Sequence, residues 1–159
     1  MPLYLSKFKT AQQSTYLQAR QEIKNGKKQT HWMWFIFPQI AGLGKSAMAE
    51  QYALKNLEEA KQYLLDETLS QRLLELTGIL AHEIKDTTAA VIFGSPDFLK
   101  WHSCLTLFNV VVNNNEEFKI DKKYQCFQDA LEKYYQGNKD QLTIEILERQ
   151  NQADTLDTK

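Results

Sequence analysis

The sequence has few of the residues that break regular structure. Its 159 residues include only six glycines and three prolines, about half of the usual combined share of roughly 12%. A fold built from many short strands needs many turn residues, so this composition favours helices. A chain of this length forms a single hydrophobic core. We expect one helical domain over residues 1–150.

Cysteines and long apolar stretches are also scarce. Cys104 and Cys126 are the only cysteines, and no apolar targeting segment opens the chain. Disulfides are rare in reducing compartments, so we expect two free thiols and a cytoplasmic location. No apolar run approaches the roughly 20 residues that a membrane helix requires. The sequence therefore predicts no membrane span.

The chain carries almost no net charge. Nineteen basic and 20 acidic side chains leave a net charge of −1, which argues against nonspecific binding of nucleic acid. Residues 1–30 nevertheless contain six Lys or Arg and a single Glu. This excess fits either a solvated basic helix face or an electrostatic guide for an anionic ligand. Nothing in the sequence indicates an oligomeric state.

Apolar spacing predicts an all-α domain of about seven to nine helices. Leu69, Leu73, Leu76 and Leu80 recur every three or four residues and indicate a helix over 68–83. Spacing and capping residues place the other helices near 5–11, 14–26, 46–52, 56–64, 87–94, 96–112 and 121–136, with a last one from 140. Residues 151–159 are polar, and we expect them to form a disordered tail.

The most unusual segment is the aromatic run His31-Trp32-Met33-Trp34-Phe35-Ile36-Phe37-Pro38-Gln39. Periodicity alone does not decide whether this run is a buried strand or a buried helical turn. His31 is a candidate general base because an imidazole titrates near neutral pH. Trp32 and Trp34 are candidates for stacking a planar ligand. The alternative is that all three are ordinary core residues.

A glycine loop follows, with the sequence Gly42-Leu43-Gly44-Lys45-Ser46. It resembles the end of a phosphate-binding P-loop, but that motif needs a glycine where this chain has Gln39. A weaker interpretation remains, in which Lys45, Ser46 and the N-terminus of the following helix hold an anion. The alternative is a normal helix cap beside a solvated lysine.

Polar residues also mark the helix expected after Pro96. Asp97, Lys100, Ser103 and Thr106 form one stripe, which fits a pocket wall. Serine and threonine hydroxyls in helices also bond to carbonyls one turn back, and an Asp near a helix start favours the dipole, so a structural role is equally available. His82 and His102 have no cluster of metal-ligating residues at suitable spacing. We predict no metal site and no cofactor.

These motifs resemble a known family. The aromatic run, the glycine loop, Ile92-Phe93-Gly94-Ser95-Pro96-Asp97, Lys100 and Ser103 with Thr106-Leu107-Phe108 are similar to the domain of unknown function 1810 family, some of whose members are named calpastatin. The resemblance extends from about Phe8 to Leu147 and implies a mainly α-helical single domain. It implies no proven activity. Four residues of the last motif depart from the family pattern: Trp101, His102, Cys104 and Leu105.

Together these observations predict a pocket walled by the aromatic run and glycine loop on one side and by the helix after Pro96 on the other. The expected ligand is a small anion such as a nucleotide derivative or sugar phosphate, and hydrolysis or group transfer is left open. His31 and Asp97 are the predicted catalytic residues. The predicted ligand-binding residues are Trp32, Trp34, Gln39, Gly42, Gly44, Lys45, Ser46, Lys100, Ser103 and Thr106. The alternative function is a noncatalytic protein-interaction module.

Overall fold

Eleven α-helices and one 3₁₀ helix make up the computed structural model, which describes residues 2–157. In chain order they are α1 (Leu3–Gln13), α2 (Tyr16–Lys24), α3 (Met33–Ile36), α4 (Ala47–Gln51), α5 (Leu57–Leu65), α6 (Glu67–His82), α7 (Ala89–Phe93), α8 (Asp97–Asn113), α9 (Glu116–Lys119), η1 (Lys122–Gln125), α10 (Cys126–Tyr135) and α11 (Gln141–Asp157). The described part contains no β-strand. The predicted all-α fold is confirmed, and the helices form one compact domain.

The predicted number of helices was too low. The helices that the sequence did not predict are α3 and α9, each only four residues long. One turn contains no repeat of the apolar spacing, so periodicity cannot detect such a helix. The structure also answers the question left open for the aromatic run, because its centre, Met33–Ile36, is a helical turn and not a strand.

Several helix starts follow the predicted caps, and others differ by a residue. The Ser46 and Asn56 side chains accept hydrogen bonds from the first turns of α4 and α5, as expected. Helix α7, expected from residue 87, is capped by Thr88. Helix α8, expected from residue 96, begins at Asp97, and no side chain caps it. Ser95 followed by Pro96 is typical of a capped helix start with proline in the first turn, but here Pro96 lies just before the helix. The Ser95–Pro96 peptide bond is cis.

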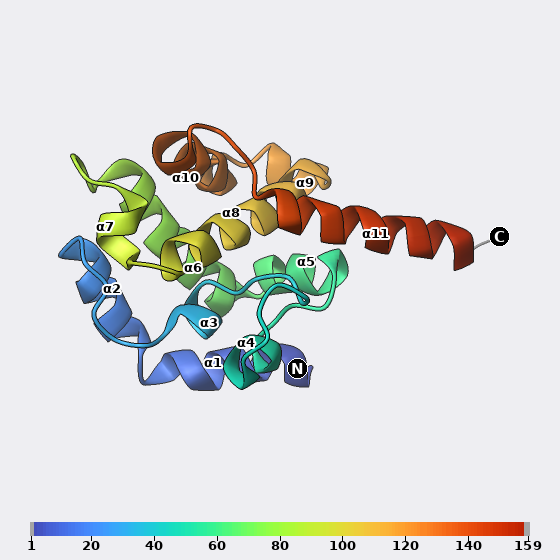
Figure 1. Cartoon of the computed structure of the whole chain (residues 1–159), viewed down its shortest axis with the longest axis horizontal. Coiled ribbons are helices and arrows are strands. Elements are labelled where there is room, and N and C mark those ends of the chain that lie inside the picture. The colour runs from blue at the N-terminus through green and yellow to red at the C-terminus, as the bar shows by residue number, and fades with distance from the viewer. Residues whose placement is uncertain (1, 158–159) are drawn as a thin grey trace.

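Two long helices organise the core. Helix α8 contacts α3, α5, α7, α9, α10 and α11, and α6 contacts α1, α2, α5 and α10. Figure 1 shows the other helices arranged around this pair, with α1 to α4 along one side. Trp101 and Phe108, both fully buried, lie on α8. Leu105 and Val112, on the same apolar face of α8, are also buried, and Phe98 is half-buried.

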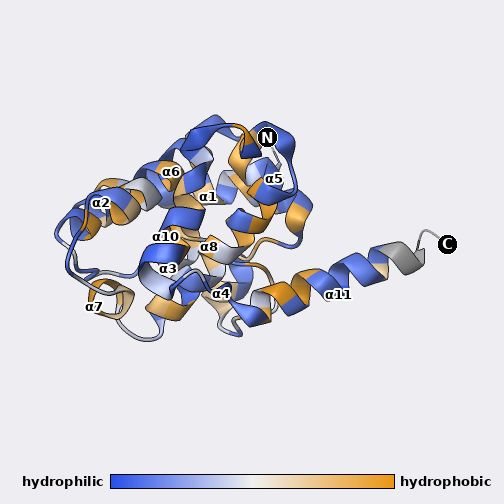
Figure 2. Cartoon of the chain, turned by 90° about the horizontal axis from the view of Figure 1, so that it is seen from above, coloured by the Kyte–Doolittle hydropathy of each residue, from blue (hydrophilic) through white to orange (hydrophobic). Residues whose placement is uncertain are grey.

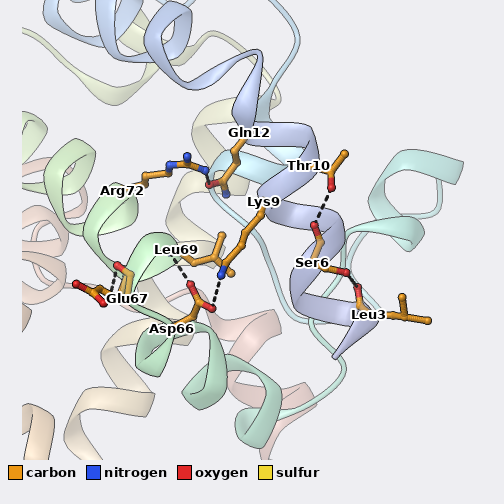
Figure 3. A network of polar contacts seen from close by, with 10 residues as sticks. Leu3, Ser6, Lys9, Thr10, Gln12, Asp66, Glu67, Leu69 and Arg72 are labelled. Carbon is orange, nitrogen blue, oxygen red and sulfur yellow. Dashed lines mark hydrogen bonds and ion pairs between the residues drawn. The ribbon is translucent and has the colours of Figure 1, made fainter. Parts of the chain in front are cut away.

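Polar contacts fasten α1 to α6. Figure 3 shows the Lys9 ammonium 2.9 Å from the Asp66 carboxylate, which also accepts a hydrogen bond from the Leu69 N–H at the start of α6. Burial alone would raise the pKa of Asp66, but the Leu69 N–H and the Lys9 ammonium outweigh it and lower this pKa. Nearby, Arg72 donates to the buried Gln12 side chain.

Helix α4 lies in a segment between Ile40 and Leu54, which we call the α4 excursion, and the two ends of this segment (its base) are paired with each other. Ile40 and Leu54 form an isolated parallel bridge, and the residues between them include the glycine loop and α4. The Tyr52 ring packs against Phe8 of α1 and Phe35 of α3, with ring centroids 5.7 and 5.3 Å away. These contacts hold the excursion against α1 and α3.

The last helix extends away from the body of the protein. Its first turns pack on α8, and its C-terminal half projects outward in Figure 1. We expected residues 151–159 to form a disordered polar tail, whereas α11 continues to Asp157. Residues 158–159 lie outside the described part of the chain. Figure 2 shows polar and apolar residues mixed along the helices, and within residues 2–157 no helix is both long and apolar enough to cross a membrane.

Candidate functional site

The start of α8 brings together three charged side chains. Asp97 lies 2.8 Å from the Lys28 ammonium through Oδ2 and 3.4 Å from the Lys100 ammonium through Oδ1. Lys28 comes from the connector after α2, while Asp97 and Lys100 share the first turn of α8. We call these three side chains the Asp97 cluster. It joins two predicted residues to one lysine, Lys28, that the sequence did not single out.

Each lysine of the Asp97 cluster lies over an indole ring. Lys28 Nζ is 5.1 Å from the centre of the Trp32 ring, and Lys100 Nζ is 5.4 Å from that of Trp34. Cation–π contacts of this length stabilise an ammonium group by about 0.5–2 kcal/mol, depending on exposure. Trp32 is fully buried, whereas Trp34 is half-buried. Of the two predicted stacking residues, only Trp34 has a surface that a ligand can reach.

The connector that carries Lys28 is held by the buried carboxylate of Glu22. Its oxygens accept hydrogen bonds from the Gln29 N–H, the Thr30 N–H and hydroxyl, and Trp32 Nε1, at 2.6 to 3.0 Å. Burial alone would raise the pKa of Glu22, but bonds from Thr30, Gln29 and Gln18 outweigh it and lower the pKa to about 2. Glu22 therefore fixes the path of the chain on both sides of Lys28.

A backbone hydrogen bond also joins the connector to α7, the helix before α8. The Lys28 N–H donates to the Ile92 carbonyl in α7 at 2.6 Å. Gly94 then ends α7 with a φ of +74°, a conformation that glycine adopts without a Cβ penalty. Helix α8 starts three residues later. The local sequence thus turns the chain so that Asp97 faces Lys28.

The glycine loop lies elsewhere. Gly42 has a φ of +104°, and a Cβ at Gly44 would come within 2.5 Å of the Ala49 Cβ, so both glycines meet conformational demands of the loop itself. The Ser46 hydroxyl caps α4, and Lys45 is exposed. Both views place α3 between α4 and α7, which leads into the Asp97 cluster (Figures 1 and 2). Lys45 and Ser46 are therefore not brought together with Asp97.

The hydroxyls of Ser103 and Thr106 contact the start of α11. Ser103 donates to Asp140 Oδ2 at 2.8 Å, and the Asp140 N–H donates to the Thr106 hydroxyl at 2.9 Å. Both hydroxyls also donate to carbonyls one turn back in α8, those of Leu99 and His102. Both residues are buried. In this structure the polar stripe of α8 therefore splits, with Asp97 and Lys100 at one end and a helix-to-helix contact at the other.

His31 and Gln39 stand apart from the Asp97 cluster. The His31 side chain is exposed, and within the described residues it makes no hydrogen bond or ion pair. The Gln39 carbonyl accepts a hydrogen bond from the Leu54 N–H at the base of the α4 excursion. No contact links either residue to Asp97.

Of five hollows on the described surface, none is lined by a predicted site residue. The largest of these five, about 590 Å³, lies along α6. The Asp97 cluster lines none of the five, and its side chains are between 7% and 26% exposed. Among the described residues, no three His, Cys, Asp or Glu side chains are close enough together to hold a metal ion.

Comparison with known proteins agrees with the fold. The chain matches, over residues 2–147, the family described as "Protein of unknown function (DUF1810)". The crystal structure of the conserved hypothetical protein Rv1873 from Mycobacterium tuberculosis is 38% identical in sequence, with a TM-score of 0.84 over 92% of this chain and 98% of that one. No curated protein matches. The resemblance seen in the motifs is thus confirmed, and this chain belongs to the DUF1810 family of proteins of unknown function.

Proposed function

We propose that this protein binds a small anionic ligand, a nucleotide derivative or a sugar phosphate, at the start of α8. The observation that carries the proposal is the position of Lys100, whose ammonium group lies between the Asp97 carboxylate and the half-buried Trp34 ring. An ammonium group beside an aromatic surface suits a ligand that combines negative charge with a planar ring.

Lys100 retains hydrogen-bonding capacity for such a ligand. Its 3.4 Å contact with Asp97 is longer than the roughly 2.7–2.9 Å of a charge-assisted hydrogen bond. Within the described residues, Asp97 is the one acceptor that Lys100 Nζ contacts, and the Lys100 side chain is 26% exposed. The dipole of α8, a helix of 17 residues, adds positive potential in its first turn. An external anion would therefore find a donor that the fold leaves available.

Asp97 has a positioning role in this proposal. Both of its oxygens contact ammonium groups, so Asp97 holds Lys28 and orients Lys100. No nucleophilic side chain contacts the cluster, and the proposal assigns no catalytic step to it. The proposal gives no role to His31 or Lys45, and Lys45 supplies a matched comparison for Lys100.

Isothermal titration with AMP, inorganic phosphate and adenosine tests the proposal. AMP and phosphate should bind and adenosine should not, because the anion supplies the main contact. Lys100→Ala should weaken AMP binding about tenfold, as expected for loss of a hydrogen bond to a charged group. Lys45 is an exposed lysine of the glycine loop before α4, and Lys45→Ala should bind AMP as tightly as the wild type does. Equal losses in the two variants, or no binding of either anion, would refute the proposal.

A protein-interaction module is the second candidate function. Val91 of α7 and Leu99 of α8 are 62% and 53% exposed on the two elements that flank the Asp97 cluster. Exposed apolar side chains around a charged centre resemble a protein-binding patch. In that case Leu99→Ser and Val91→Ser would abolish binding of a protein partner, while AMP and phosphate would produce no heat in titration.

A further inference from the structure

The hollow along α6 has no part in the proposed function. It measures about 590 Å³ and lies between α6 on one side and η1 with the start of α10 on the other. Ligand sites in proteins commonly measure about 300–1,000 Å³. Its middle is formed by Leu74, Gly78 and Cys126. Burial raises the pKa of Cys126 to about 12, so this thiol acts as an apolar surface.

The presence of a glycine at position 78 supports a ligand in this hollow. Gly78 lies inside the 16-residue helix α6, where glycine is less favourable than alanine. A Cβ at this position would meet no atom within 4 Å, so no contact in the fold requires a glycine there. A second hollow of about 510 Å³, between α6 and α2, shares Leu74, Glu75, Gly78 and His82 with the first. Gly78 thus leaves the helix surface bare where the two hollows meet.

The charges that line the hollow favour an anion near η1. Lys122 has no ion pair in the described residues, and Lys123 is paired only loosely, 3.8 Å from Asp121. Both lysines are exposed. They therefore form a positive rim on the η1 side of the hollow, beside an apolar surface.

The other charged groups around the hollow are mostly paired. Glu75 contacts Arg20 Nε at 2.9 Å and accepts a hydrogen bond from the Tyr16 hydroxyl. His82 lies 2.8 Å from Asp129. Glu67, in the first turn of α6, is the exception: its carboxylate has no ion pair in the described part of the chain. The negative charge of Glu67 should repel an anion, so removing this charge should strengthen anion binding.

We propose that this hollow is a second binding site, for an organic anion with an apolar body. The apolar body would lie over Leu74 and Gly78, and the anionic group would contact Lys122 and Lys123. None of these residues belongs to the Asp97 cluster, so the inference stands independently of the proposed function.

Titration with 8-anilinonaphthalene-1-sulfonate, an aromatic anion whose fluorescence rises in apolar surroundings, tests the site. The titration uses the Lys100→Ala variant, because the Asp97 cluster is itself proposed to bind planar anions, and we expect one saturable site per chain. Gly78→Leu fills the hollow and should weaken binding at least about tenfold, while the melting temperature stays equal or rises because leucine favours helix more than glycine does. The folded variant then shows that lost binding is not lost structure.

Charge variants supply a second readout. Lys122→Gln and Lys123→Gln should each weaken binding about two- to fivefold, as expected for exposed charges, and Glu67→Gln should strengthen it by a similar factor. Lys139→Gln, another exposed lysine, should leave it unchanged. The inference is overturned by the absence of saturable fluorescence, by full binding in Gly78→Leu, or by equal losses in Lys122→Gln and Lys139→Gln.

Discussion

The Lys28 ammonium lies 2.8 Å from the Asp97 carboxylate, and the Lys28 side chain is only 7% exposed. This pair connects the segment after α2 to the first residue of α8 across a long sequence separation. A nearly buried ammonium group is costly when it has no counter-charge. Asp97 therefore stabilises the fold, and the same carboxylate fixes the position of Lys100.

Replacing Asp97 should separate these two effects. Asp97→Asn leaves Lys28 without a counter-charge and should lower the free energy of unfolding by about 1–3 kcal/mol, measured by urea denaturation. Phosphate binding should become stronger in the same variant, because removing the negative charge beside the anion outweighs the loss of the contact that orients Lys100. Asp121→Asn removes a loose, exposed ion pair and serves as the control. A catalytic role for Asp97 predicts no gain in phosphate affinity.

The buried carboxylate of Glu22 should make stability depend on pH. Its pKa is about 2 in the folded protein, against an ordinary value of 4.5. A lowered folded pKa means that the stabilisation is complete above the unfolded pKa and is lost as the pH falls through the folded one. A shift of this size corresponds to about 3 kcal/mol.

Glu22→Gln tests this dependence. The variant should be about 2–3 kcal/mol less stable than the wild type at pH 7. The difference should shrink steadily between about pH 5 and pH 2 as the wild-type carboxylate takes up its proton. A difference that stays constant over this range would contradict the assigned role of the Glu22 charge.

Sequence patterns predicted the fold more completely than the site. Long helices such as α6 repeat their apolar residues over several turns, so their spacing identified them. Helix α3 completes a single turn and left no such signal. The cis Ser95–Pro96 bond also escaped prediction, because the same two residues are typical of a capped helix start.

The site depended on contacts between distant parts of the chain. Asp97 and Lys100 stand out by their place at a helix start, but nothing near Lys28 in the sequence shows that it reaches Asp97. Glu22, the single acid among the first 30 residues, was the available signal that a buried partner lies in this region. For Ser103 and Thr106, the sequence allowed two roles, in a pocket wall or in a structural contact. In the structure both side chains are hydrogen-bonded to Asp140.

Asp140 should control the attachment of α11. Its Oδ2 accepts hydrogen bonds from the hydroxyls of Ser103 and Thr143, at 2.8 and 2.6 Å. Asp140→Ala removes both bonds and the cap of α11, and should lower the free energy of unfolding by about 2 kcal/mol. Amide hydrogen exchange should accelerate throughout α11. Asp154→Ala, at an exposed position of the same helix, should change neither quantity.

Gly78 should be replaceable with a gain in stability. The open space around its Cα accommodates a methyl group, and alanine is favoured over glycine inside a helix. Gly78→Ala should raise the free energy of unfolding by about 0.5–1 kcal/mol. A loss of stability would mean that the hollow along α6 is narrower than the structure indicates.

The most direct test of the central claim is a nuclear magnetic resonance titration of the isotope-labelled protein with AMP. The account predicts that the largest shifts fall on the backbone N–H groups of residues 94, 95 and 97–100 and on the Trp34 indole N–H, and that Lys100→Ala needs about tenfold more AMP to reach them. Shifts confined to residues 42–49 would contradict it, because they would locate the anion at the glycine loop instead of at the Asp97 cluster.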